Sequence, residues 1–184
     1  MSTVEELSAQ LFRLVHLARS IAMKCALTAV EPEPKLNFWR LVLGNQLDIA
    51  VLEWCKVFGS HAEATHWKNV VPVTEHDQYR IDLLTSLGVN ADDWSSYWEE
   101  MKEYRDNLVA HHIEAAKVPN YPKLDLALHS SFFHYKYVIG KLRALNETRY
   151  PNDLQAYYGA FEAQAREIAK VSTAATSDMQ ERVY

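Results

Sequence analysis

Signals that begin and end helices recur along this chain, and no segment alternates apolar and polar residues as a half-buried strand does. Thr3 and Glu6 form a capping-box pattern, which predicts a helix from the N-terminus to about Ala29. The stretch EPEPK predicts a stiff turn. Asn37 is then the expected cap of a second helix that ends at Gly59. These signals predict an all-α protein.

Further helices are expected in the rest of the chain. Residues 61–71 predict a short helix. Longer ones are expected from Thr74 to about Gly88, from Asn90 through WSSYWEEMKEYRDNLVAHH, over 124–147 and over 152–172. Their short connections favour an up-and-down helical bundle with short accessory helices. We expect residues 1–172 to form one domain and residues 173–184 a flexible tail.

The segment FWRLVLGNQLDIAVLEWCKVFG is apolar nearly all round, so this helix is expected to be the central and most buried one. Its four charged residues argue against a membrane span. The polar N-terminus shows no secretory signal. Cys25 and Cys55 have no framework spacing and are expected to be buried thiols in a reducing compartment. These features together predict a cytoplasmic protein without a membrane partner.

The formal charge of −5 argues against a protein that coats nucleic acid through its overall charge. One segment, residues 129–150, is locally basic and interleaved with aromatic residues. Its cations are Lys136, Lys141, Arg143 and Arg149, with Glu147 as the one acid. The segment is either a solvated helix face or a candidate RNA-binding surface.

The stretch KEYRDNLVAHHIE carries the candidate chemistry, because Arg105 is followed by two histidines, His111 and His112. In an ideal α-helix Arg105 and His112 lie nearly on one face, whereas His111 follows Tyr104. A guanidinium binds phosphate through a planar fork, and an imidazole exchanges protons near neutral pH. In RNA the 2′-hydroxyl can attack the adjacent phosphate without a metal, which makes RNA a suitable substrate for such a pair.

This spacing alone is weak evidence, since an arginine followed by a histidine five to seven residues later occurs about once by chance in such a chain. Two structural alternatives stay open. Arg105 could pair with Asp106 of a dimer mate or with a glutamate of a neighbouring helix, and His111 could hydrogen-bond a carbonyl.

The sequence YRDNLVAHH resembles the Rx4–6H motif of HEPN-domain proteins, and residues 38–71 resemble the HEPN subgroup named for phage abortive infection. The resemblance implies a helical bundle that forms a homodimer and cleaves RNA in a cleft between the two copies. It implies that Arg105 and His111 are catalytic, that Asp106 and Asn107 position them, and that His112 also falls within the allowed window. Tyr104, directly before the arginine, is expected to support the site.

The expected function is therefore that of a metal-independent endoribonuclease acting in phage defence or as a toxin. The resemblance implies an RNA substrate, a homodimer mate and an antitoxin protein as partners, and no cofactor. The alternative is a non-catalytic bundle that serves as a partner- or RNA-binding component of a defence or toxin–antitoxin system.

Other residue patterns point to packing more than to chemistry. His61 and His66, like His129 and His134, are five residues apart and lack the spacing of metal ligands, so no metal is expected. The aromatic residues Trp94, Tyr97 and Trp98 are interpreted as core or dimer contacts, with base stacking as the other option.

Overall fold

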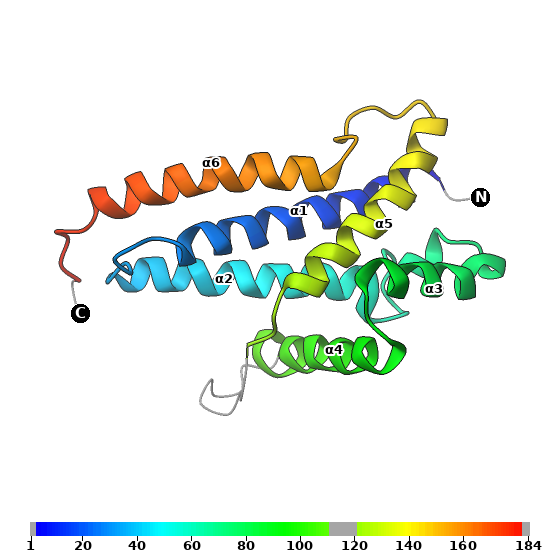
Figure 1. The fold of residues 1–184 in the computed structure, drawn as a ribbon, viewed down its shortest axis with the longest axis horizontal. Coiled ribbons are helices and arrows are strands. Elements are labelled where there is room, and N and C mark those ends of the chain that lie inside the picture. Colours follow the sequence, from blue (N-terminus) through cyan, green and yellow to red (C-terminus); the bar gives the residue numbers. More distant parts are fainter. Residues whose placement is uncertain (1–2, 111–120, 182–184) are drawn as a thin grey trace.

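The prediction of an all-helical protein is confirmed. A computed structural model describes residues 3–110 and 121–181, and within these ranges it contains six α-helices and no strand (Figure 1). The helices are α1 (Val4–Thr28), α2 (Asn37–Trp54), α3 (His76–Leu87), α4 (Ala91–Tyr104), α5 (Asp125–Ala144) and α6 (Leu154–Ala175). Two π-helical turns extend α2 and α4, namely η1 (Cys55–Gly59) and η4 (Arg105–Ala110). Two short 3₁₀ turns, η2 (Trp67–Asn69) and η3 (Val73–Glu75), precede α3.

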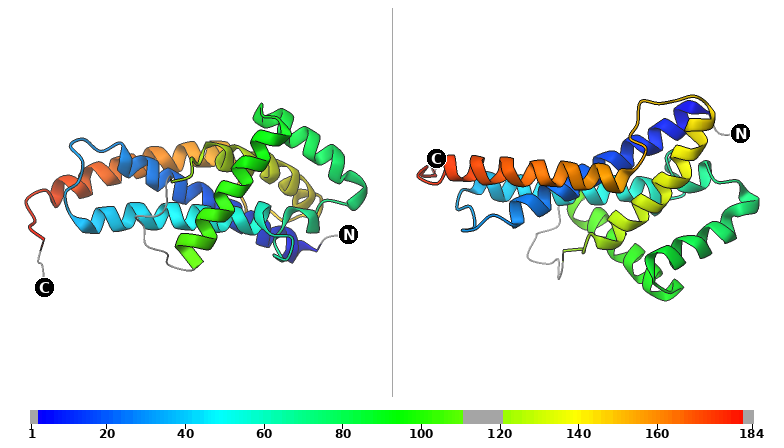
Figure 2. Two further views of the ribbon diagram at one scale, coloured as in Figure 1. Left: turned by 90° about the horizontal axis from the view of Figure 1, so that it is seen from below. Right: turned by 45° about the horizontal axis from the view of Figure 1, so that its top comes forward.

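The central helix of the bundle is α1, which packs against α2, α5 and α6 (Figures 1 and 2). Leu7, Leu11 and Leu14 of this helix recur at helical spacing and are fully buried. The expectation that α2 is the most buried helix is wrong. Phe38 and Leu41 in its first half are 59% and 64% exposed. The main helix contact of α2 is with α1, whereas α1 packs against three helices.

The capping box at the start of α1 is present as predicted. The Thr3 hydroxyl accepts from the Glu6 amide, and the Glu6 carboxylate accepts from the Thr3 amide. The helix α3 ends at Gly88, which has the left-handed φ of 66° that favours glycine. The side chain of Asn90 caps α4 by accepting from two backbone amides.

The start of α2 differs from the prediction. Leu36 occupies the N-cap position without a side-chain hydrogen bond, and Asn37 is the first helical residue. The Asn37 side chain instead donates to Glu181 at 2.7 Å, a contact between residues 144 positions apart that local sequence cannot reveal. At the other end of the chain, α6 extends to Ala175, three residues beyond the predicted end. The flexible tail stays a prediction.

The predicted short helix over residues 61–71 is wrong, since this stretch forms turns and only the brief η2. Side chains of this stretch donate hydrogen bonds to backbone carbonyls, in the stretch itself and in η1, that a helix would have paired with backbone amides. Asn69 donates to the carbonyls of Glu63 and Ala64, both at 3.0 Å, and Thr65 donates to the carbonyl of Lys56 at 3.1 Å.

A buried polar chain joins α3, α5 and α1. The Tyr79 hydroxyl lies 2.8 Å from Nδ1 of His134, and Nε2 of His134 lies 2.6 Å from Oε1 of Gln10. Gln10 in turn donates to the carbonyl of His66 at 2.8 Å, which fixes the orientation of its amide. Since Oε1 can only accept, His134 carries its proton on Nε2 and accepts from Tyr79 at Nδ1. Burial lowers the pKa of His134 to about 3, so this ring is neutral.

Candidate active site at the end of α4

The residues around Arg105 are positioned by the inner face of α4. Tyr97, Met101 and Tyr104 are buried and recur at helical spacing, so they fix this face against the end of α2 and against η1. The outer face carries the exposed acids Glu99, Glu100 and Glu103. At Arg105 the α-helix widens into the π-helical turn η4, a feature that often marks functional sites.

Tyr104 anchors this turn to the middle of α2. Its hydroxyl donates to the carboxylate of Asp48 at 2.7 Å. Burial and this carboxylate together raise the pKa of Tyr104 well above its usual value, so the phenol stays protonated. Sequence reasoning did not identify Asp48, because 56 positions separate it from Tyr104 and no spacing rule connects them.

The guanidinium of Arg105 lies at the protein surface beside η1. Its Nε and Nη2 atoms both lie 2.7 Å from Oδ1 of Asp106, and 20% of the Arg105 side chain is exposed. A Cβ atom placed on Gly59 would lie 3.7 Å from Nη1, at ordinary contact distance, so the guanidinium lies close to this end of η1. Arg105 thus pairs within its own chain with Asp106, and its charge is partly open to solvent.

Cys55 lies on η1 and is buried, as predicted. Burial raises the pKa of this thiol to about 12, against the opposing positive charge of Arg105. The thiol is therefore protonated at neutral pH and is no nucleophile. Cys25 is only half-buried, so the expectation of a buried thiol is wrong for this residue.

Two of the predicted site residues, His111 and His112, lie outside the described residues. Asn107 is half-buried on η4, next to Asp106. The angle expected between Arg105 and the histidines came from an ideal α-helix. Residues Arg105–Ala110 instead form the π-helical turn η4, whose i to i+5 hydrogen bonding makes a wider turn.

The basic segment lies elsewhere. Figure 1 shows the far end of α5 beside the start of α1, with the end of α4 on the other side of the bundle. Its four cations are Lys136, Lys141, Arg143 and Arg149. Lys136 is exposed, whereas Lys141 donates to the carbonyl of Val70 at 3.0 Å. Burial lowers the pKa of Lys141.

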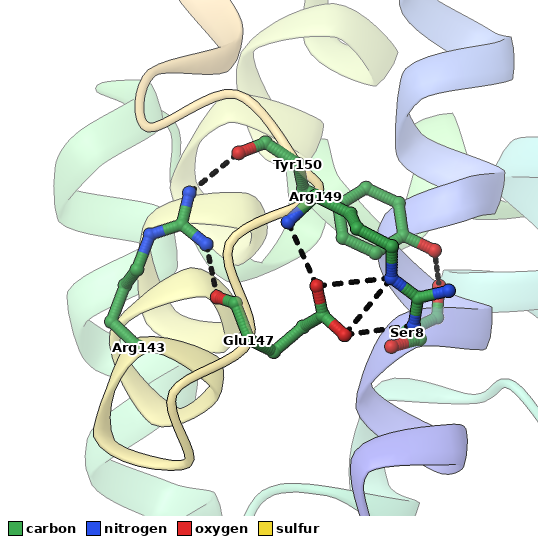
Figure 3. Close-up of polar contacts among 5 residues, drawn as sticks. All are labelled: Ser8, Arg143, Glu147, Arg149 and Tyr150. Carbon is green, nitrogen blue, oxygen red and sulfur yellow. Dashed lines mark hydrogen bonds and ion pairs between the residues drawn. The ribbon is translucent and has the colours of Figure 1, made fainter.

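The other two cations hold the connection between α5 and α6 in place (Figure 3). Arg143 donates to the carbonyls of Glu147 and Tyr150, and the Tyr150 hydroxyl donates to the Ser8 carbonyl at 3.1 Å. Arg149 forms an ion pair with Glu147 at 2.7 Å, and its hydrogen bonds lower the pKa of that carboxyl to about 2. These contacts are structural, so a solvated face does not describe the whole segment.

The predicted histidine pairs are not part of a metal-binding cluster in the described part of the chain. Within residues 3–110 and 121–181, no three His, Cys, Asp or Glu side chains come together as metal ligands do. His134 belongs to the buried polar chain, while the rings of His61 and His66 lie 4.6 Å apart. Trp94 and Tyr97 pack on the buried Trp54 with ring centroids 5.8 and 5.5 Å away. Tyr97 is thereby confirmed as a core residue, whereas Trp94 is only partly buried against the core.

No helix in the described part of the chain is long and apolar enough to cross a membrane. Comparisons with models of protein families, with curated proteins and with solved structures found no match.

Proposed function

We propose that this chain is a metal-independent endoribonuclease of the HEPN type, acting in phage defence or as a toxin. The observation that carries the proposal is the placement of Arg105. Its guanidinium is partly exposed on a π-helical turn, directly before the segment that contains His111. Asp106 orients the fork of the guanidinium, and such a surface ion pair is weak enough for a phosphodiester to compete with it.

In the proposed reaction, His111 acts as the general acid or base. A base removes the proton of the 2′-hydroxyl, the bond from O2′ to phosphorus forms, and the bond from phosphorus to O5′ breaks. The leaving 5′-oxygen takes up a proton. Arg105 stabilises the negative charge that builds on the phosphoryl oxygens. The products are a 2′,3′-cyclic phosphate and a 5′-hydroxyl.

The proposed active form is a homodimer in which both copies of Arg105 line one cleft. The exposed acids of α4 repel RNA, so basic groups of a facing protomer are required to offset them. An antitoxin protein is a further proposed partner.

The direct test is incubation of the purified chain with total RNA in EDTA. We expect cleavage, and a loss of about 100-fold or more in rate for Arg105→Ala and for His111→Ala. Arg40→Ala and His129→Ala are matched controls, because both side chains are exposed and belong to other helices, α2 and α5. Cleavage that persists in both site variants would reject this assignment.

A second candidate is a non-catalytic bundle that binds a partner protein. It is favoured by an apolar groove of about 220 Å³ between α1, α2 and α6, near the exposed side chains of Phe38 on α2 and Ile168 on α6. Bacterial growth separates the candidates. Expression of the wild-type chain slows growth relative to His111→Ala if it is a ribonuclease toxin, whereas equal growth and uncut RNA favour the binding module.

A further inference from the structure

A concave site lies between the loop before α3, α3 itself and α4. The cavity has a volume of about 320 Å³, within the range of small-molecule sites. Its chemistry comes from three tryptophans and three basic side chains, namely Trp67, Trp94, Trp98, His61, Lys68 and Arg80. They come from three separate segments of the chain.

The tryptophan walls are held in place by the core. Trp67 stacks on the buried ring of Tyr79, with centroids 4.5 Å apart and planes 14° apart. Trp94 packs edge-on against Phe58, and Trp98 donates its indole N–H to the carbonyl of Phe58 at 2.8 Å. These contacts fix the positions of the three rings before a ligand binds, which lowers the ordering cost of packing a planar ligand against them.

The cations at this cavity have few acidic neighbours. Lys68 and Arg80 both approach the ring of Trp67, at 5.7 and 5.8 Å from its centroid. No aspartate or glutamate is among the residues that line the cavity, all of which belong to the described chain. The nearest acid to Arg80 is Asp77, 3.9 Å away and 97% exposed, a contact worth little in water.

The charges at the cavity also repel one another. Partial burial and the positive charges of Lys68 and Arg80 lower the pKa of His61. Burial, and after it the positive charge of Arg80, lowers the pKa of Lys68 as well. An anion bound between these groups would relieve this repulsion.

We propose that this cavity binds a small aromatic anion, a planar ring that carries a phosphate or a carboxylate. The ring lies against Trp94 and Trp98, and the anionic group lies between Lys68 and Arg80. The site is separate from Arg105, and the proposal does not depend on ribonuclease activity.

Two probes show whether the cavity prefers a phosphate or a carboxylate as the anionic group. The full chain is titrated with adenosine 5′-monophosphate and with indole-3-carboxylate, and binding is measured by calorimetry. We expect saturable binding of at least one probe. Adenosine and indole have the ring without the anionic group, and inorganic phosphate has the anionic group without the ring. Each should therefore bind at least ten-fold more weakly than the corresponding probe. No saturable binding of either probe, or equal affinity for its ring or its anionic group alone, would overturn the proposal.

Variants locate the site. Arg80→Ala and Lys68→Ala remove the cationic groups and should each weaken binding at least ten-fold, while Arg40→Ala should leave it unchanged. Ser95→Phe fills the mouth of the cavity from an exposed position on α4 and keeps every charge, so it should also block binding. Circular dichroism checks that each variant is folded. Unchanged affinity in the folded Arg80→Ala and Ser95→Phe variants would show that the probe binds elsewhere and would reject the site.

Discussion

At the scale of single residues, the most informative group is the buried polar chain through Gln10. This side chain is 1% exposed and satisfies two buried partners, the N–H of His134 and the carbonyl of His66. A buried polar group that loses its partner pays the full cost of leaving water, whereas a satisfied one contributes little. The main role of Gln10 is therefore to keep two buried polar groups, on His134 and His66, from losing their hydrogen-bond partner.

Replacing Gln10 by alanine is expected to lower the free energy of unfolding by about 3 kcal/mol, because it leaves two buried polar groups unpaired and opens a small void. Urea denaturation measures this. Gln78→Ala is the matched control, since Gln78 lies on the surface of α3 and its side chain donates to the exposed carboxylate of Asp82. A loss no larger than that of the control would contradict the role given to Gln10.

His134 also predicts how stability depends on pH. Its pKa is about 3 in the folded protein and 6.5 in an unfolded chain, so protonation favours the unfolded state. The contribution of the neutral ring is fully present above pH 6.5 and is lost as the pH falls toward 3. The slope is about 1.4 kcal/mol per pH unit for this one group.

The test compares the free energy of unfolding at pH 6 and pH 4.5. The wild-type chain should lose more stability over this interval than His134→Gln, which has no proton to take up. His129→Gln carries the same substitution on an exposed face of α5 and should behave as the wild type. Identical slopes for all three proteins would show that His134 does not titrate with unfolding.

At the scale of elements, local signals predicted the helix ends that are capped by nearby residues. They failed where contacts between residues far apart in the sequence determine the structure. The capping box at Thr3 and the cap at Asn90 depend on residues within one turn, so the sequence was enough to predict them. Asn37 has the right chemistry for a cap, but it bonds Glu181 from the far end of the chain. The degree of burial of α2 was mispredicted because apolar periodicity does not say how many helices lie alongside.

Glycine substitutions test the assignment of helix ends. Gly88→Ala should lower the free energy of unfolding by about 1 kcal/mol, because alanine is strained at a φ of 66°. Gly140→Ala is the matched control. It lies inside α5 with nothing within 4 Å of a new Cβ, and it should stabilise by about 0.5–1 kcal/mol. Thermal unfolding distinguishes the two, and stabilisation by Gly88→Ala would contradict the left-handed end of α3.

At the scale of the whole molecule, the sequence indicated Arg105 and its neighbour Asp106 but not what surrounds them. Asp48, which anchors this turn, and Gly59, which lies beside the guanidinium, reach it only through folding. The aromatic cavity was missed for the same reason, since its residues come from three segments that show no motif of their own.

The proposed composite site requires two copies of the chain. Sedimentation velocity should therefore give a species of twice the 21.2 kDa mass of one chain at the concentrations where RNA is cleaved. Full cleavage activity in a strictly monomeric preparation would contradict a site shared between protomers and leave Arg105 to act within one chain.

The central claim is that Arg105 and His111 promote attack by the 2′-hydroxyl of RNA. Mass spectrometry of the fragment ends after cleavage in EDTA tests it most directly. The account predicts 2′,3′-cyclic phosphate and 5′-hydroxyl ends, and no cleavage of the same RNA carrying 2′-O-methyl groups. Fragments with 3′-hydroxyl and 5′-phosphate ends, or cleavage of the methylated RNA, would contradict it.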